Sequence, residues 1–206
     1  MKDIRLLTKL LGGFIIVALI VLAVGFVGLL GARGLNAEIR NIGRNRLAGV
    51  KNLLQVAEAQ AQVNVAENTL LQRSLDAGSA QDIFKEFDAR KKVIDDSLAV
   101  FESLSKSKDE LNLWSQFKPA ADAWWKVNQD FIGLAQAYWS SPSDEAFTAM
   151  QSQMAQNGRE FGVANSLLHD LVRINDQEAN LAVQEGSAMG ARVEAASMAG
   201  MGVGIV

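Results

Sequence analysis

The hydrophobic pattern of the chain begins with a long apolar run, Leu10–Leu30, which has no charged or hydrogen-bonding side chain. An α-helix needs about 20 apolar residues to cross the hydrocarbon core of a bilayer, whereas the apolar part of a signal peptide usually has about 7–15. The residues after the run, Gly31–Gly34, match the small-residue pattern of a cleavage site poorly. The pattern therefore predicts a transmembrane helix over residues 10–31, and a cleaved signal is the alternative.

A second apolar run closes the sequence at residues 197–206, SMAGMGVGIV. It is too short to span a bilayer, yet no polar residue ends it as in a soluble helix. We expect it to be the start of a second transmembrane helix that is truncated here. A natural C-terminus with a loose hydrophobic tail is the alternative.

The region between the runs, residues 32–196, has the apolar spacing of helices. Three Ser-x-x-acid patterns that suit helix starts, at Ser79, Ser107 and Ser141, divide it into four segments. Pro119 is expected to kink the third helix or to make it restart. Within the segments, apolar residues recur mostly at intervals of three, four and seven. In the second and third segments they are Ile83, Phe87, Ile94, Leu98 and Phe101, then Leu111, Trp114, Phe117, Ala121, Trp124, Phe131 and Tyr138.

Narrow apolar stripes on four consecutive helices with short connections predict an all-α, antiparallel four-helix bundle. The first helix can run from Arg33 to Asp76 and the fourth from Ser143 to Met198, so both are long and continuous with the transmembrane helices. Trp114 and Trp124 lie on the apolar stripe and are predicted to be core residues. Trp125 lies off the stripe and Trp139 lies at the end of the helix, and both are candidates for an exposed surface or a dimer contact.

The charged residues before the first apolar run predict how the chain is oriented in the membrane. Lys2, Arg5 and Lys9 precede the first run against the single acid Asp3, and short flanks rich in Lys and Arg stay in the cytoplasm. Residues 1–9 are therefore expected to be cytoplasmic, and the bundle is expected on the other side of the membrane. The net charge of −3 and the lack of basic clusters argue against a nucleic-acid partner.

Candidate chemistry is sparse. The chain has no Cys and one histidine, His169, and no His, Asp or Glu cluster has the spacing of metal ligands. No Gly-rich phosphate loop or nucleophile with a neighbouring base is present. We therefore expect no catalytic residue, no metal and no cofactor, and hence a protein that is not an enzyme.

A binding site is the more informative possibility. On the first bundle helix Gln60, Asn64, Asn68 and Arg73 are spaced by four, four and five residues, which places them near one face. At equal helical rise, Asn157 and Arg159 of the fourth helix fall at about the same height. These side chains are a candidate ligand site, but for each of the two arginines a solvated helix face is the interpretation that we prefer, because Arg is mostly exposed in a bundle.

Two segments and the apolar run together point to a known family. LLGGF lies inside the run, Leu35–Leu47 reads LNAEIRNIGRNRL, and residues 167–175 read LLHDLVRIN before Glu178 and Ala179. Their order and spacing resemble the N-terminal part of bacterial methyl-accepting chemotaxis proteins. The resemblance implies a homodimer in the bacterial inner membrane whose periplasmic or extracellular bundle detects a small molecule, directly or through a periplasmic binding protein.

The resemblance also implies how the module signals. Ligand would shift the fourth helix against the first, and a cytoplasmic domain of the full-length protein would act on a histidine kinase and its adaptor to control chemotaxis. Relatives that bind amino acids use arginines of the first and fourth helices for the carboxylate, which suggests Arg73 and Arg159. The alternatives are the same sensor joined to a histidine kinase or nucleotide cyclase, and a structural membrane bundle that senses nothing.

Overall fold

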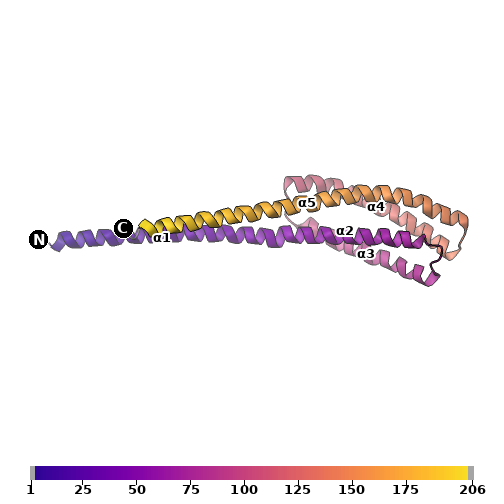
Figure 1. The fold of residues 1–206 in the computed structure, drawn as a ribbon, viewed down its shortest axis with the longest axis horizontal. Coiled ribbons are helices and arrows are strands. Elements are labelled where there is room, and N and C mark those ends of the chain that lie inside the picture. Colours follow the sequence, from indigo (N-terminus) through magenta and orange to yellow (C-terminus); the bar gives the residue numbers. More distant parts are fainter. Residues whose placement is uncertain (1–2, 204–206) are drawn as a thin grey trace. The chain divides into compact units, whose positions relative to one another are not determined.

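The computed structural model describes residues 3–203, and every regular element among them is helical (Figure 1). The elements are α1 (Asp3–Asn41), a π-helical segment η1 (Ile42–Arg46), α2 (Leu47–Leu70), α3 (Ala77–Ser103), α4 (Lys108–Ser140) and α5 (Asp144–Val203). They form two compact units. One holds residues 45–178, and the other holds the described residues up to 44 and from 179 onward.

The unit of residues 45–178 is a four-helix bundle made by α2, α3, α4 and the first part of α5, which confirms the predicted fold class. Helices α2 and α5 run antiparallel, because Gly49 lies against Asn175 while Glu67, further along α2, bonds Asn157. A Cβ atom at Gly49 would lie 2.7 Å from Oδ1 of Asn175, so glycine permits the close approach of the two helices there.

The core of this bundle consists of large apolar side chains from all four helices. Trp114 and Trp124 are buried as predicted, and Trp125 and Trp139 are half-buried against the core. Leu111 was expected on the core stripe but is 52 % exposed, because the stripe of α4 starts at Trp114. The largest fully buried apolar side chains are Trp124, Phe87, Phe101, Phe117, Phe131, Leu53, Leu70, Met150, Leu168 and Leu171.

The first boundary of the bundle differs from the prediction. Helix α2 ends at Leu70 rather than at Asp76, and α3 starts at Ala77 with Asp76 as its N-cap instead of Ser79. Oδ1 of Asp76 accepts a hydrogen bond from the Ser79 amide at 2.9 Å, and its Oδ2 accepts one from the Ser79 hydroxyl at 2.6 Å. These bonds from Ser79 lower the pKa of Asp76. The carboxylate satisfies an N-terminal amide of α3, so the chain leaves the helical conformation before residue 77.

The start of α4 agrees with the prediction, whereas the start of α5 lies slightly later in the sequence than predicted. Ser107 and Glu110 form the predicted capping box at the start of α4. Helix α5 starts at Asp144, and the hydroxyl of Ser143, not Ser141, accepts from the Ala146 amide at 3.1 Å. Pro119 lies inside α4, which runs from Lys108 to Ser140 without the restart that we considered.

The second unit contains α1 and the end of α5. The apolar part of α1 is long enough to cross a membrane, with a mean hydropathy of 3.0 over an 18-residue window of which none is buried. Within this unit the two helices lie side by side and antiparallel (Figure 1), since Gly31 faces Val193 and Gly34 faces Met189. Helix α5 extends to residue 203, so the last three residues of the predicted second membrane segment lie outside the described residues.

Candidate functional site

The predicted ligand residues of α2 lie on its partly solvated side. Asn64 is half-buried and Asn68 is exposed. The Nδ2 atom of Asn68 donates to the Asn64 carbonyl at 2.7 Å and to its Oδ1 at 3.3 Å. Gln60, which we placed near the same face, is instead fully buried in the core. The two asparagines therefore form a local pair on one helix.

Arg73 lies in the turn between α2 and α3 and not on the helix face where spacing had placed it, because α2 has already ended. Its Nη1 atom is 2.8 Å from Oδ1 of Asp144, and its guanidinium lies 4.1 Å from the centre of the Phe147 ring. More than half of each charged side chain is exposed, so the ion pair adds little to stability. Arg73 thus joins the α2–α3 turn to the start of α5.

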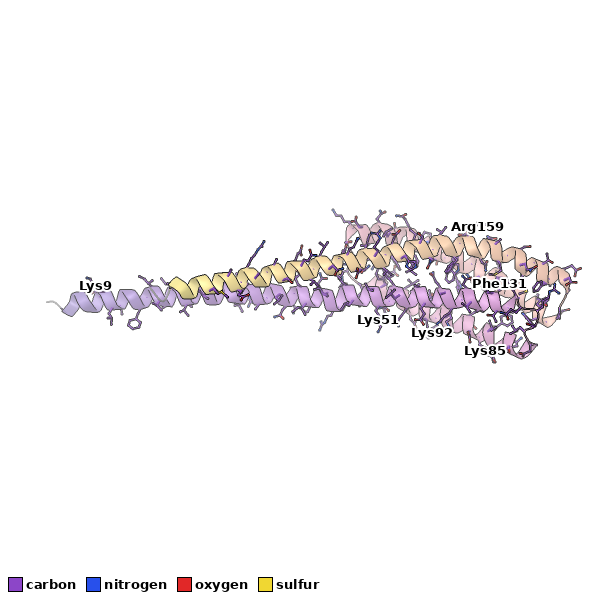
Figure 2. The ribbon with its side chains drawn as sticks, in the orientation of Figure 1. Lys9, Lys51, Lys85, Lys92, Phe131 and Arg159 are labelled. Carbon is purple, nitrogen blue, oxygen red and sulfur yellow. The ribbon has the colours of Figure 1, made fainter. Side chains whose placement is uncertain are left out.

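Asn157 and Arg159 of α5 have separate environments. Arg159 is exposed at the outer edge of the helix (Figure 2), whereas only 1 % of Asn157 is exposed. Asn157 bonds Glu67 of α2, which confirms the predicted equal height of the two helices. The structure places the five predicted residues in the same half of the bundle, but it distributes them over a helix surface, a turn and the core.

Sequence reasoning missed a chain of polar groups in the core. Nδ2 of Asn157 donates to Oε1 of Glu67 at 2.5 Å. Nε2 of Gln153, one turn earlier on α5, is 3.3 Å from Oδ1 of Asn157 and 3.3 Å from the Val127 carbonyl of α4. These contacts connect α2, α5 and α4.

The spacing on α2 could have revealed the buried members of this chain. Residues 53, 56, 60, 63, 67 and 70 alternate by three and four, and all are buried. This is the spacing of core positions in a helical bundle, and it places Gln60 and Glu67 inside. Burial raises the pKa of Glu67 to about 7, against a smaller lowering by the bond from Asn157.

A second polar cluster lies where α2 begins, and Arg46 is its centre. Nη1 of Arg46 is 2.6 Å from Oε2 of Glu110 on α4 and 2.5 Å from Oε2 of Glu178 on α5. Glu110 is 1 % exposed, and besides its contact with Arg46 its Oε2 accepts a hydrogen bond from the amide of Ser107 at 2.7 Å. One guanidinium therefore connects three helices of the bundle.

The neighbouring residue Asn45 attaches the α3–α4 turn to the same place. Its Nδ2 donates to the Ser105 carbonyl at 2.8 Å, and its Oδ1 accepts from the Ser105 amide at 2.9 Å. Asn45 and Arg46 both belong to the π-helical segment, a rare conformation that often occurs at functional positions. The turn and the π-helical segment thus hold each other in place.

The described residues offer little for catalysis. Within residues 3–203, no group of three or more His, Cys, Asp or Glu side chains is arranged to hold a metal ion. His169 is exposed on α5. The polar side chains within the bundle instead join its helices, at Glu67–Asn157 and around Arg46.

Comparison with known families identifies the class of protein. The sequence model described as "four helix bundle sensory module for signal transduction" matches residues 3–189. The chain belongs to this family, and its resemblance to the N-terminal sensor domain of methyl-accepting chemotaxis proteins is confirmed. A search of curated proteins found no match. The protein is a sensory module for signal transduction, of a family whose members typically have no enzymatic activity.

Proposed function

We propose that this module is the sensory part of a chemoreceptor anchored in the bacterial inner membrane. Residues 10–31 form the first transmembrane helix, residues 1–9 are cytoplasmic, and residues 32–196 form the periplasmic or extracellular sensor domain. Residues 197–206 begin the second transmembrane helix. The sensor detects a small molecule, or a periplasmic binding protein that carries one, and passes a helix shift to a cytoplasmic domain that acts on a histidine kinase and its adaptor to control chemotaxis.

One observation carries this proposal: the helix with the membrane-length apolar segment continues into the first helix of the bundle, interrupted only by the π-helical segment. Helix α5 likewise runs without a break from Asp144 to Val203. A continuous helix transmits a displacement along its axis, because its backbone hydrogen bonds resist compression. Shifts of about 1–2 Å are typical of helices that signal at packed interfaces.

The candidate ligand contacts are Asn64, Asn68, Arg73 and Arg159, whereas Asn157, the fifth residue of the predicted set, is buried against Glu67 and is not accessible to a ligand. Arg159 and Arg73 are exposed and can offer a guanidinium to a carboxylate. The asparagine amides of α2 can bond polar groups of the same ligand. Guanidinium and amide donors of this kind suit a small carboxylic acid, such as an amino acid.

We propose that the module acts as a homodimer through α2. Leu47, Leu54 and Val65 of this helix are 57 %, 50 % and 66 % exposed. Their spacings of 7 and 11 residues align them within about 20° on the helix. An exposed apolar stripe of this kind is typical of a protein–protein contact.

Ligand binding is tested on the purified full chain in lipid nanodiscs. The midpoint of thermal unfolding is measured with a panel of amino acids and small carboxylic acids, since a ligand that binds only the folded state must stabilise it. At least one acid is expected to raise the midpoint, and Arg159→Ala is expected to weaken its binding about tenfold or more. Arg173→Ala, an exposed arginine on the same helix, is the control.

Two outcomes contradict the assignment. If Arg159→Ala and Arg173→Ala weaken binding equally, Arg159 is not a ligand contact. If no acid in the panel changes the unfolding midpoint, direct sensing of carboxylates is excluded. Recognition of a binding protein is then the remaining form of the proposal.

A further inference from the structure

Two carboxylates are buried among the described residues, and their surroundings differ in one respect. Glu110 is 1 % exposed and Glu67 is 2 % exposed. Glu110 has the guanidinium of Arg46 at 2.6 Å, whereas Glu67 accepts a hydrogen bond from the neutral amide of Asn157. A buried carboxyl group without a cation favours its protonated form, because the low dielectric disfavours the charge.

The charged groups around Glu67 do not remove this difference. The nearest in sequence are Glu58, nine residues before it on the same helix, and Arg73, six residues after it in the α2–α3 turn. Those at the same height on the other helices are exposed, apart from the half-buried Glu160, and none of them is among the causes of the shifted pKa of Glu67. They are Asp82, Lys85 and Glu86 on α3, Lys126 and Asp130 on α4, and Arg159 and Glu160 on α5.

The position of Glu67 gives its protonation a structural consequence. Its bond to Asn157 joins α2, which follows α1 through the π-helical segment, to α5, which extends beyond the residues of the bundle. Asn157 is joined in turn to Gln153, whose amide also reaches the Val127 carbonyl of α4. A charge placed on Glu67 therefore acts at a point where three helices are connected.

We propose that Glu67 and Asn157 form a proton-sensitive contact between α2 and α5, so that the sensory module responds to pH as well as to its ligand. This inference rests on the proposed function, because pH becomes a stimulus only if the bundle faces the cell exterior. The protonated contact lets the helices pack with a neutral core. Ionisation places a charge in this core that the amide of Asn157 compensates only in part, so it favours looser packing of α2 against α5 or the entry of water.

The direction of the effect follows from the two pKa values of Glu67, about 7 when folded and about 4.5 when unfolded. A folded-state pKa above the unfolded value means that the stabilisation is complete below pH 4.5. This stabilisation of the folded state decreases as the pH rises from 4.5 toward 7. Above pH 7 the contribution of Glu67 to stability no longer changes. The folding equilibrium is expected to change on the order of a hundredfold across this window.

The test compares the full chain in detergent with three neutral variants. Thermal unfolding is followed by circular dichroism between pH 5 and pH 8.5. The wild type is expected to lose stability as the pH rises, and Glu67→Gln is expected to remove most of this dependence. The controls are Glu58→Gln, an exposed carboxyl on the same helix, and His169→Gln, which removes the only histidine. Both control variants are expected to keep the pH dependence of the wild type.

A second measurement does not depend on the folding of a variant. Carbon-13 NMR of the glutamate carboxyl carbons of the wild type is expected to show one resonance that titrates near pH 7. If every glutamate titrates between pH 4 and 5, or if Glu67→Gln retains the full pH dependence, the inference is wrong. Neither result affects the ligand test, so the two proposals fail separately.

Discussion

At the residue scale, one arginine holds the bundle together where α2 begins. Arg46 neutralises Glu110, which is almost completely buried, and also contacts Glu178 of α5. Removing one partner of a buried ion pair leaves an uncompensated charge, which is more costly than losing the pair as a whole. The stability of the bundle should therefore depend on Arg46 more than on any exposed arginine.

Replacing Arg46 with Met keeps the length of the side chain and removes its charge. We expect Arg46→Met to lower the free energy of unfolding by about 3–5 kcal/mol, because Glu110 is left without its cation. Arg46→Met combined with Glu110→Gln should recover part of this loss. The measurement is denaturant unfolding of the full chain in detergent, with the exposed Arg44→Met as the control. Equal stability of Arg46→Met and Arg44→Met would refute this role.

At the element scale, the sequence predicts well what is local and poorly what depends on distant partners. The capping box of α4 was predictable because Ser107 and Glu110 are three residues apart and satisfy each other. The starts of α3 and α5 were misplaced because a nearby residue, Asp76 or Ser143, caps the helix instead. The π-helical segment was not predicted, since its contacts are with residues about 60 positions away.

The candidate site, like the helix boundaries, could be predicted from the sequence only in part. The equal height of Asn157 and the α2 residues followed from helical rise alone. Polarity alone did not predict which side chains are buried. Gln60 and Glu67 are polar, yet both occupy core positions. The position of Arg73 depended on a helix end that the sequence placed six residues too late.

The exposed apolar stripe of α2 gives a prediction about the dimer. The chain has no Cys, so an introduced cysteine is the only thiol present. We expect Leu54→Cys to form a disulfide-linked dimer on mild oxidation in native membranes, because Leu54 lies at the centre of the stripe. Lys92→Cys, on the exposed side of α3, should remain monomeric on a denaturing gel. Comparable cross-linking of both variants, or none in either, would contradict a dimer through α2.

At the scale of the whole molecule, the account combines a membrane-length apolar helix with a four-helix sensory bundle in one chain. From the charges before the apolar run we propose that the first residues lie in the cytoplasm and the bundle outside. All proposed stimuli, whether a carboxylic acid, a binding protein or the proton, require this orientation. The location of the bundle is therefore the central claim.

Cysteine labelling of cells that express the full chain tests this claim most directly. Asp88→Cys places a thiol on the exposed side of α3, and Asp3→Cys places one before the apolar run. A membrane-impermeant maleimide, added to cells with a permeabilised outer membrane, is predicted to label Asp88→Cys at once and Asp3→Cys only after lysis. If Asp88→Cys is protected until lysis, the bundle lies in the cytoplasm, and the proposed detection of external stimuli is wrong.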